Sequence, residues 1–172
     1  MEPRSMNLAK LPRGSEVFVD ASILSLYFTK QKPLGAICRA FLDRCASRDL
    51  KAYTSVITAA ETIHRVIVAE AIRRYELPPR KAVTYLKRHP DKVKELHEHL
   101  KVASEIYRLG VDILPVTHIH LHQSKHFRTD YGLMTNDSLI VAVMQDHKLV
   151  HIATNDRDFK RVRGIKVWMP IE

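Results

Sequence analysis

Short runs of β-branched and aromatic residues alternate along this chain with longer segments in which apolar residues recur at helical spacing. The strand-like runs are residues 16–20, 51–56, 112–116, 148–154 and 165–169. The helix-like segments are residues 22–28, 34–47, 58–75, 79–88, 90–108, 117–130 and 138–147. Several connections are long enough to cross over a sheet, so neighbouring strands can run parallel. The order predicts a three-layer α/β/α sandwich with a mainly parallel central sheet.

The length of the chain fits a single folded domain. With 172 residues, of which 45% are hydrophobic, it can bury a core without disulfides or metal clips. Residues 1–14 show no periodic pattern. We therefore interpret them as an N-terminal tail, followed by a single domain over residues 15–172.

The cysteines and the apolar runs indicate a cytoplasmic protein without membrane contact. Cys38 and Cys45 lie two helical turns apart in one segment. A straight helix holds them about 10 Å from each other, which is too far for a disulfide. No apolar run approaches the length of a membrane span, and the N-terminus lacks an apolar signal region. We expect a reducing compartment.

The charge of the chain favours polyanionic partners. The formal net charge is +9, and the sequence pI is about 9.7. Basic surfaces attract nucleic acids, although many basic proteins have no specific polyanionic ligand. Charge alone therefore leaves the question of nucleic-acid binding open.

Four acidic residues stand out against this basic background, each where a predicted strand ends or a predicted helix begins: Asp20, Glu61, Asp137 and Asp156. Ligands of parallel sheets bind beyond the carboxyl ends of the strands, and acids at helix starts can reach the same edge. Convergent carboxylates repel one another unless a cation lies between them. Mg²⁺ (or Mn²⁺) prefers such oxygen ligands and can activate water for phosphodiester hydrolysis. The pattern predicts a metal-dependent nuclease site.

The four acids lie in four short motifs that together span nearly the whole chain. These are Phe18-Val19-Asp20-Ala21-Ser22, then Thr54-Ser55-Val56-Ile57 leading to Glu61, then Asn136-Asp137-Ser138-Leu139-Ile140-Val141-Ala142, and finally Thr154-Asn155-Asp156-Arg157-Asp158-Phe159. Each motif alone is a weak pattern. In this order, the four resemble the PIN-domain family, and particularly the VapC-type toxins of bacterial and archaeal toxin–antitoxin pairs.

The resemblance implies a role for each acid. Asp20, Glu61 and Asp137 would bind the metal directly, and Asp156 would complete the acidic pocket. The segment between Glu61 and Asp137 is longer than in the most compact toxins, and its helical part over residues 76–110 has no assigned role.

The resemblance also implies supporting residues around the ligands. Ser22 matches a small hydroxyl residue that orients the first aspartate, and from its position it is also a candidate cap for the helix that follows. Asn136 and Asp158 would support the metal ligands without binding the metal themselves.

Several of these residues also have a purely structural interpretation. Asp20 is a suitable helix cap, and Asp137 is a first-turn acid that the helix dipole favours. Glu61 can form an i,i+4 pair with Arg65 on a solvated face. The joint occurrence of the four motifs favours the metal site for these three acids, whereas Asp158 is as well explained as a turn residue.

Histidines and basic residues form two further groups. His118, His122 and His126 recur every four residues, with His120 between them, but neither an HExxH pattern nor a nearby cysteine supports zinc. We expect a solvated or half-buried polar face. The basic residues that could contact RNA are Arg73, Arg74, Arg80, Lys81, Lys87 and Arg88, and, after the fourth acid, Arg157, Lys160, Arg161 and Arg163. For the first set, an ordinary solvated helix face explains the pattern equally well.

The family resemblance implies a metal-dependent ribonuclease that hydrolyses RNA. It also implies a homodimer that pairs through helices of the N-terminal half, and a VapB-like antitoxin as partner. Two alternatives remain open: a PIN-fold nuclease of RNA maturation that is not a toxin, and a PIN-fold binding or scaffold module without hydrolysis.

Overall fold

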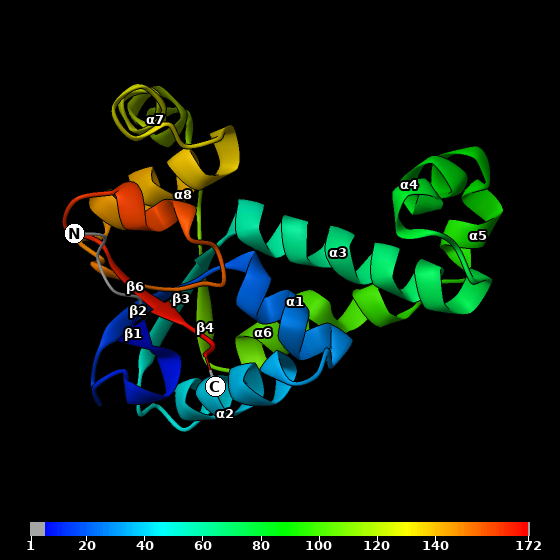
Figure 1. Cartoon of the computed structure of the whole chain (residues 1–172), viewed down its shortest axis with the longest axis horizontal. Helices are drawn as coiled ribbons and strands as arrows, with labels where there is room; N and C mark the ends of the chain where they lie inside the picture. The colour runs from blue at the N-terminus through cyan, green and yellow to red at the C-terminus, as the bar shows by residue number, and fades with distance from the viewer. Residues whose placement is uncertain (1–5, 172) are drawn as a thin grey trace.

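The computed structural model describes residues 6–171 and contains one parallel sheet between two layers of helices (Figure 1). The strands are β1 (Met6–Asn7), β2 (Glu16–Val19), β3 (Lys51–Ser55), β4 (Val111–Leu114), β5 (His151–Ala153) and β6 (Lys166–Met169). Their order across the sheet is β1-β6-β5-β2-β3-β4, and every pairing is parallel. The predicted α/β/α sandwich is confirmed.

Eight α-helices and three short 3-10 helices connect the strands in the described part of the chain. The α-helices are α1 (Ala21–Thr29), α2 (Leu34–Ala46), α3 (Val56–Tyr75), α4 (Pro79–Arg88), α5 (Pro90–Lys94), α6 (Val102–Arg108), α7 (His118–Tyr131) and α8 (Thr135–Asp146). The 3-10 helices are η1 (Leu8–Lys10), η2 (Glu98–Lys101) and η3 (Asp158–Arg161).

The central strand β2 shows how one short run of residues serves both helical layers. Val17 and Val19 pack into the core formed with α1, α2 and α6. Phe18 points to the opposite face and packs into the core formed with α8 and η3. Side chains alternate across a strand, so a strand buried on both faces has to be apolar throughout. This explains why residues 17–19 form a continuous apolar run that ends abruptly at Asp20.

The N-terminal residues differ from the predicted tail. Met6 and Asn7 form the edge strand β1 beside β6, and Leu8 and Leu11 are almost completely buried in the core. The strand is too short to produce a periodic pattern, and its hydrogen bonds to β6 hold it in place. Residues 1–5 of the predicted tail lie outside the described residues.

The helix predicted over residues 90–108 is divided into α5, η2 and α6. The interruption has two causes in the residues that follow α5. Leu96 is buried in a small core, and the backbone N–H groups of His97 and Glu98 donate to the carboxylate of Glu70, at 3.1 and 2.9 Å. These N–H groups therefore bond to a side chain of α3 instead of continuing a helical ladder.

Residues 76–101, which we call the arm, pack against the far end of α3, away from the sheet (Figure 1). The arm has a small apolar core of its own, in which Leu86 and Leu96 pack on Ala71 of α3. Within residues 6–171, none of the helices has both the length and the apolar character that a membrane crossing requires.

Two glycines with left-handed backbones provide a test of the packing between α2 and β4. Gly110 has φ +70°, and a Cβ there would lie 2.7 Å from the carbonyl oxygen of Cys45. Gly14 has φ +74°, with no atom within 4 Å of such a Cβ.

We expect Gly14→Ala to lower the free energy of unfolding by about 1 kcal/mol, from backbone strain alone. Gly110→Ala should lower it by about 2–4 kcal/mol, because overpacking adds to the strain. Denaturant unfolding measures both, and equal losses would contradict the packing argument.

Candidate active site

Asp20 begins the site at the carboxyl end of β2. It is the N-cap of α1, and its Oδ2 accepts a hydrogen bond from the backbone N–H of Ser22 at 3.3 Å. The predicted capping by Ser22 is therefore wrong, because the chain turns into the helix two residues earlier. The side chain of Asp20 is 7% exposed, so its charge is largely removed from bulk water.

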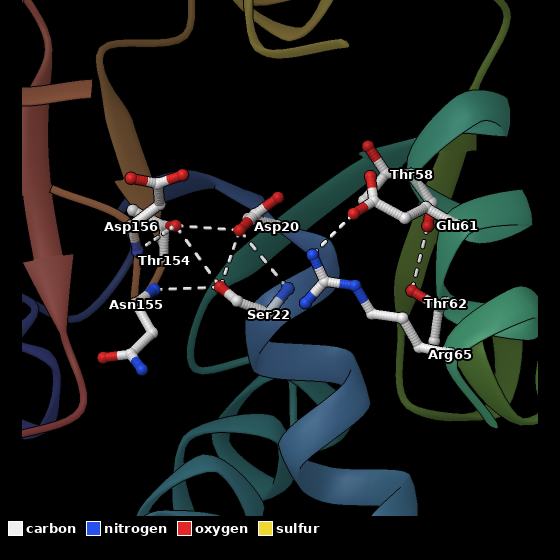
Figure 2. A network of polar contacts seen from close by, with 9 residues as sticks. All are labelled: Asp20, Ser22, Thr58, Glu61, Thr62, Arg65, Thr154, Asn155 and Asp156. Carbon is white, nitrogen blue, oxygen red and sulfur yellow. Dashed lines mark hydrogen bonds and ion pairs between the residues drawn. The ribbon is translucent and has the colours of Figure 1, made fainter. Parts of the chain in front are cut away.

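Two hydroxyl groups hold the same oxygen of Asp20. Ser22 Oγ donates to Oδ2 at 2.6 Å, and Thr154 Oγ1 donates to it at 2.8 Å (Figure 2). Hydrogen bonds to a charged acceptor are about twice as strong as neutral ones. The orientation of Asp20 is therefore fixed, with Oδ1 directed away from these donors. Ser22 makes the contact that an orienting residue requires, and its catalytic role stays a prediction.

The loop that follows β5 is fastened to the start of α1 by the same hydroxyls. The backbone N–H of Asn155 donates to Ser22 Oγ at 2.9 Å, and the N–H of Asp156 donates to Thr154 Oγ1 at 3.0 Å. This brings the fourth acidic motif beside the first, across 132 residues of sequence or more. Asp156 is half-buried at this position.

Asp158 is engaged within its own turn. Its N–H donates to Asp156 Oδ1 at 2.8 Å, and its carboxylate pairs with Arg161 at 2.7 Å. The structural interpretation of Asp158 accounts for both contacts. The first of them also helps to hold the side chain of Asp156.

Asp137 lies in the first turn of α8, and the field of the other acids converges on it. The pKa of its carboxyl is raised from 3.8 to about 6, first by burial and then by the charges of Asp156, Asp20 and Glu61, in that order, with a smaller effect of Asp158. The four acids belong to four separate elements of the chain. Their effect on one carboxyl places the four acids in one region of the structure, which we call the acidic pocket.

Glu61 is part of this field but already has a cationic partner. Its Oε1 lies 2.6 Å from Nη2 of Arg65, one turn later on α3 (Figure 2). The i,i+4 pair weighed from the sequence is therefore present. Within residues 6–171, no three histidine, cysteine, aspartate or glutamate side chains are already close enough to form a metal cage.

The donor set nevertheless suits a hard divalent cation. All four side chains are carboxylates, and carboxylate oxygens are the ligands that Mg²⁺ and Mn²⁺ prefer. A cation in the pocket would relieve the repulsion that raises the pKa of Asp137. Asp20, Glu61, Asp137 and Asp156 are the residues that could hold it, provided that Arg65 releases Glu61.

Other predicted residues lie differently. Asn136 is exposed, and its side chain forms no hydrogen bond among residues 6–171, so its supporting role stays a prediction without a contact behind it. His118, His122 and His126 are exposed, as expected for a polar face, whereas His120 is buried. Nδ1 of His120 accepts a hydrogen bond from the backbone N–H of Thr117. The ring proton therefore lies on Nε2, which is 3.2 Å from Oδ2 of Asp146.

Two residues of the pocket had no role assigned from the sequence. Thr154 is completely buried and joins Asp20 to the backbone of Asp156. Its position at the end of a predicted strand, two residues before an acid, was the available signal. Arg65 was noticed only as a structural partner, because its place beside the pocket depends on the packing of α3 near α1.

A family comparison agrees with this geometry. The model of the PIN domain matches residues 17–165, which contain all four acids. The chain belongs to the PIN-domain family. Members of this family are nucleases. Comparison with curated proteins finds no match.

Solved structures with the same fold come from toxin–antitoxin systems. A toxin–antitoxin complex from Klebsiella pneumoniae is 18% identical, with a TM-score of 0.57 over 91% of this PIN domain chain and 98% of that chain. VapC20 from Mycobacterium tuberculosis, a sarcin-ricin loop cleaving toxin, is 16% identical, with a TM-score of 0.58 over 88% and 98%. VapBC2 from Rickettsia felis, bound to a DNA fragment from its promoter, is 16% identical, with a TM-score of 0.57 over 90% and 98%. At these identities, the likeness concerns the fold.

The raised pKa of Asp137 predicts a stability that depends on pH. Folding raises this pKa, so the stabilising contribution is complete below about pH 4 and is lost as the pH rises through about 6. In EDTA at pH 7.5, Asp137→Asn should therefore be more stable than the wild type by about 1–2 kcal/mol, after allowance for solvent screening. The difference should shrink at pH 4. Chemical unfolding at both pH values measures it, and a variant that is less stable at pH 7.5 would contradict the convergence of the acids on Asp137.

Proposed function

We propose that this PIN domain is a ribonuclease that hydrolyses RNA phosphodiester bonds with Mg²⁺ or Mn²⁺. The convergence of four carboxylates from separate elements, expressed in the raised pKa of Asp137, carries the proposal. Repulsion between these carboxylates destabilises the protein in the absence of cations. A reaction that requires a bound cation explains why the cluster is present. The basic character of the chain, with a net charge of +9, favours a polyanionic substrate.

The roles of the residues follow from their contacts. When bound, a divalent cation supplies an activated water and neutralises the charge that develops on the phosphate. Asp20 enters the reaction already oriented, because Ser22 and Thr154 fix one of its oxygens. Asp137 and Asp156 complete the ligand set, and Asp156 is kept in place by the N–H of Asp158.

Arg65 sets a condition on the role of Glu61. The guanidinium neutralises Glu61 as long as no stronger cation competes for it. Release of Glu61 would leave Arg65 with a positive charge beside the pocket, where a substrate phosphate can accept its hydrogen bonds. Among the basic residues after the fourth acid, Arg157 is exposed and forms no ion pair within residues 6–171, whereas Arg161 is paired with Asp158.

A toxin of the VapC type is the more specific form of the proposal. The similar solved structures from toxin–antitoxin systems support it, and a VapB-like antitoxin would then be the protein partner. A homodimer that pairs through its N-terminal helices belongs to the same hypothesis. A nuclease of RNA maturation would share the chemistry but would lack an antitoxin, and a scaffold module would bind RNA without cutting it.

RNA cleavage tests the chemistry directly. Purified wild-type protein should cleave RNA in Mg²⁺ or Mn²⁺ and not in EDTA. Asp20→Asn and Asp137→Asn should each lower the rate by about 100-fold or more, because each removes a charged ligand from the pocket. Asp112→Asn, which neutralises an exposed acid of β4, is the matched control and should retain the wild-type rate. Mn²⁺ should also raise the unfolding temperature of the wild type and of the control more than that of Asp137→Asn.

The outcomes separate the hypotheses. Metal-dependent cleavage that survives both substitutions in the pocket would reject the site. Wild-type protein that binds RNA and never cleaves it would favour the scaffold alternative.

Toxicity distinguishes a toxin from a maturation enzyme. Induced expression of the wild type in a bacterial host should stop growth, because a free toxin cleaves RNA that the cell needs. Expression of Asp20→Asn to the same level should not, and Asp112→Asn should be as toxic as the wild type. Normal growth with active wild-type nuclease in the cell extract would exclude toxicity in that host and favour the maturation enzyme.

A further inference from the structure

One face of α4 carries four cations and no acid. The helix buries Ala82 and Leu86 against the arm's core. The basic residues lie on the opposite, solvent-exposed face: Arg80, Lys81, Lys87 and Arg88. The spacing produces this arrangement, because residues seven apart lie on the same side of a helix, about 10 Å from each other. Arg80 aligns with Lys87 in this way, and Lys81 aligns with Arg88.

These four cations are unpaired, in contrast to their neighbours. Within the described part of the chain, none of the four forms an ion pair. Three other cations at or near the arm are held by two of its acids: Arg73 by Glu98, and Arg74 and Lys92 by Glu95. Glu95 and Glu98 therefore attach the arm to α3, and the charge of the α4 face remains available to a ligand.

The arm is firmly attached, so its charged face has a fixed position relative to the acids. The buried carboxylate of Glu70 on α3 accepts the N–H groups of His97 and Glu98. The hydroxyl of Tyr75, near the end of α3, donates to the carbonyl of Lys92 at 3.0 Å. Buried polar contacts of this kind fix one arrangement of packed elements.

A surface hollow lies between the α4 face and the part of α3 that follows Glu61. The hollow, of about 250 Å³, has a mainly apolar lining, with His64 of α3 and Lys87 of α4 as its basic members. His64 lies three residues after Glu61, so the two residues are neighbours on the surface of α3. From Glu61 to Tyr75, α3 extends about 20 Å. Of the four cations of α4, Lys87 is the one that lines this hollow, on the side of an extended polyanion that follows α3 from the acids.

We propose that the basic face of α4 binds the phosphate backbone of RNA outside the catalytic pocket, and so selects RNA long enough to reach from the acids to the arm. The inference rests on the proposed ribonuclease function. Phosphates are the ligands that match a row of unpaired, exposed Lys and Arg side chains. The few aromatic residues on this face favour recognition of the backbone over stacking of bases.

RNA binding in EDTA tests the arm independently of cleavage. The variant Arg80→Gln/Lys81→Gln/Lys87→Gln/Arg88→Gln removes the four charges at exposed positions. With a labelled RNA of about 30 nucleotides, we expect at least about tenfold weaker binding by fluorescence anisotropy. The slope of log affinity against log salt should fall by about 3, since each phosphate contact to a single strand contributes about 0.7.

The matched control removes four positive charges at the amino-terminal edge of the sheet, which is opposite the edge that carries the acids. Arg48→Gln/Lys51→Gln/Lys148→Gln/Lys166→Gln replaces four exposed cations at or before the starts of β3, β5 and β6. Its RNA affinity should remain within about twofold of the wild type, because only nonspecific attraction is reduced. Circular dichroism and thermal unfolding verify that both variants are folded.

Cleavage of two RNA lengths separates the arm from the proposed function. The α4 variant should cleave an RNA of about 4 nucleotides as the wild type does, and should show a raised KM with the long RNA only. Equal RNA affinity of the α4 variant and the wild type would overturn the inference, as would equal weakening by the control. If the wild type never cleaves RNA and the α4 variant loses RNA binding, the role of the arm in RNA binding is supported and the nuclease function is rejected.

Discussion

The pocket depends on the hydrogen bonds that converge on one oxygen of Asp20. Ser22 from the start of α1 and Thr154 from the end of β5 both donate to Oδ2, and their hydroxyls in turn accept the backbone N–H groups of Asn155 and Asp156. The start of α1 and the end of β5 lie at the carboxyl edge of the sheet and are thus joined through the carboxylate of Asp20. A charged acceptor with so little exposure is costly unless such donors are present. The same bonds fix the direction in which the other oxygen points.

Around the fixed carboxylate of Asp20, the site contains carboxylates that repel one another. Burial, and then the charges of Asp156, Asp20, Glu61 and Asp158, raise the pKa of Asp137 to about 6. A fold selected for stability alone would not collect like charges in a half-buried pocket, and strain of this kind is typical of functional sites. The ion pair between Glu61 and Arg65 relieves part of the repulsion without a metal. The basic surface of the protein, including the face of α4, then gives a polyanion two places to bind: beside the pocket and along the arm.

Much of the fold could be predicted from local patterns, and the failures have physical reasons. The apolar run Val17-Phe18-Val19 identifies a strand buried on both faces, and the helices that flank it have clear apolar spacing. The strand at Met6–Asn7 is too short for any periodicity, and its partner residues in β6 lie 162 positions away in sequence. The break after Lys94 depends on Glu70, a residue of another helix. No property of residues 90–108 alone distinguishes these N–H groups from those of a continuous helix.

The sequence by itself determined which residues could form a site: four acids at element ends, in motifs whose order identifies the family. Their chemistry is local, since a carboxylate at a helix start or strand end can be recognised from its neighbours. Only the tertiary structure decided which partners they have. Thr154 became the link between the first and fourth motifs because the parallel sheet brings strand ends together that are more than a hundred residues apart in the chain. The pair of Glu61 with Arg65 is local to α3, and tertiary packing decided only that it lies near the other acids. The tertiary structure also decided that Glu95 and Glu98 of the arm pair with cations of α3 and of the arm itself, whereas the four cations of α4 form no ion pair among the described residues.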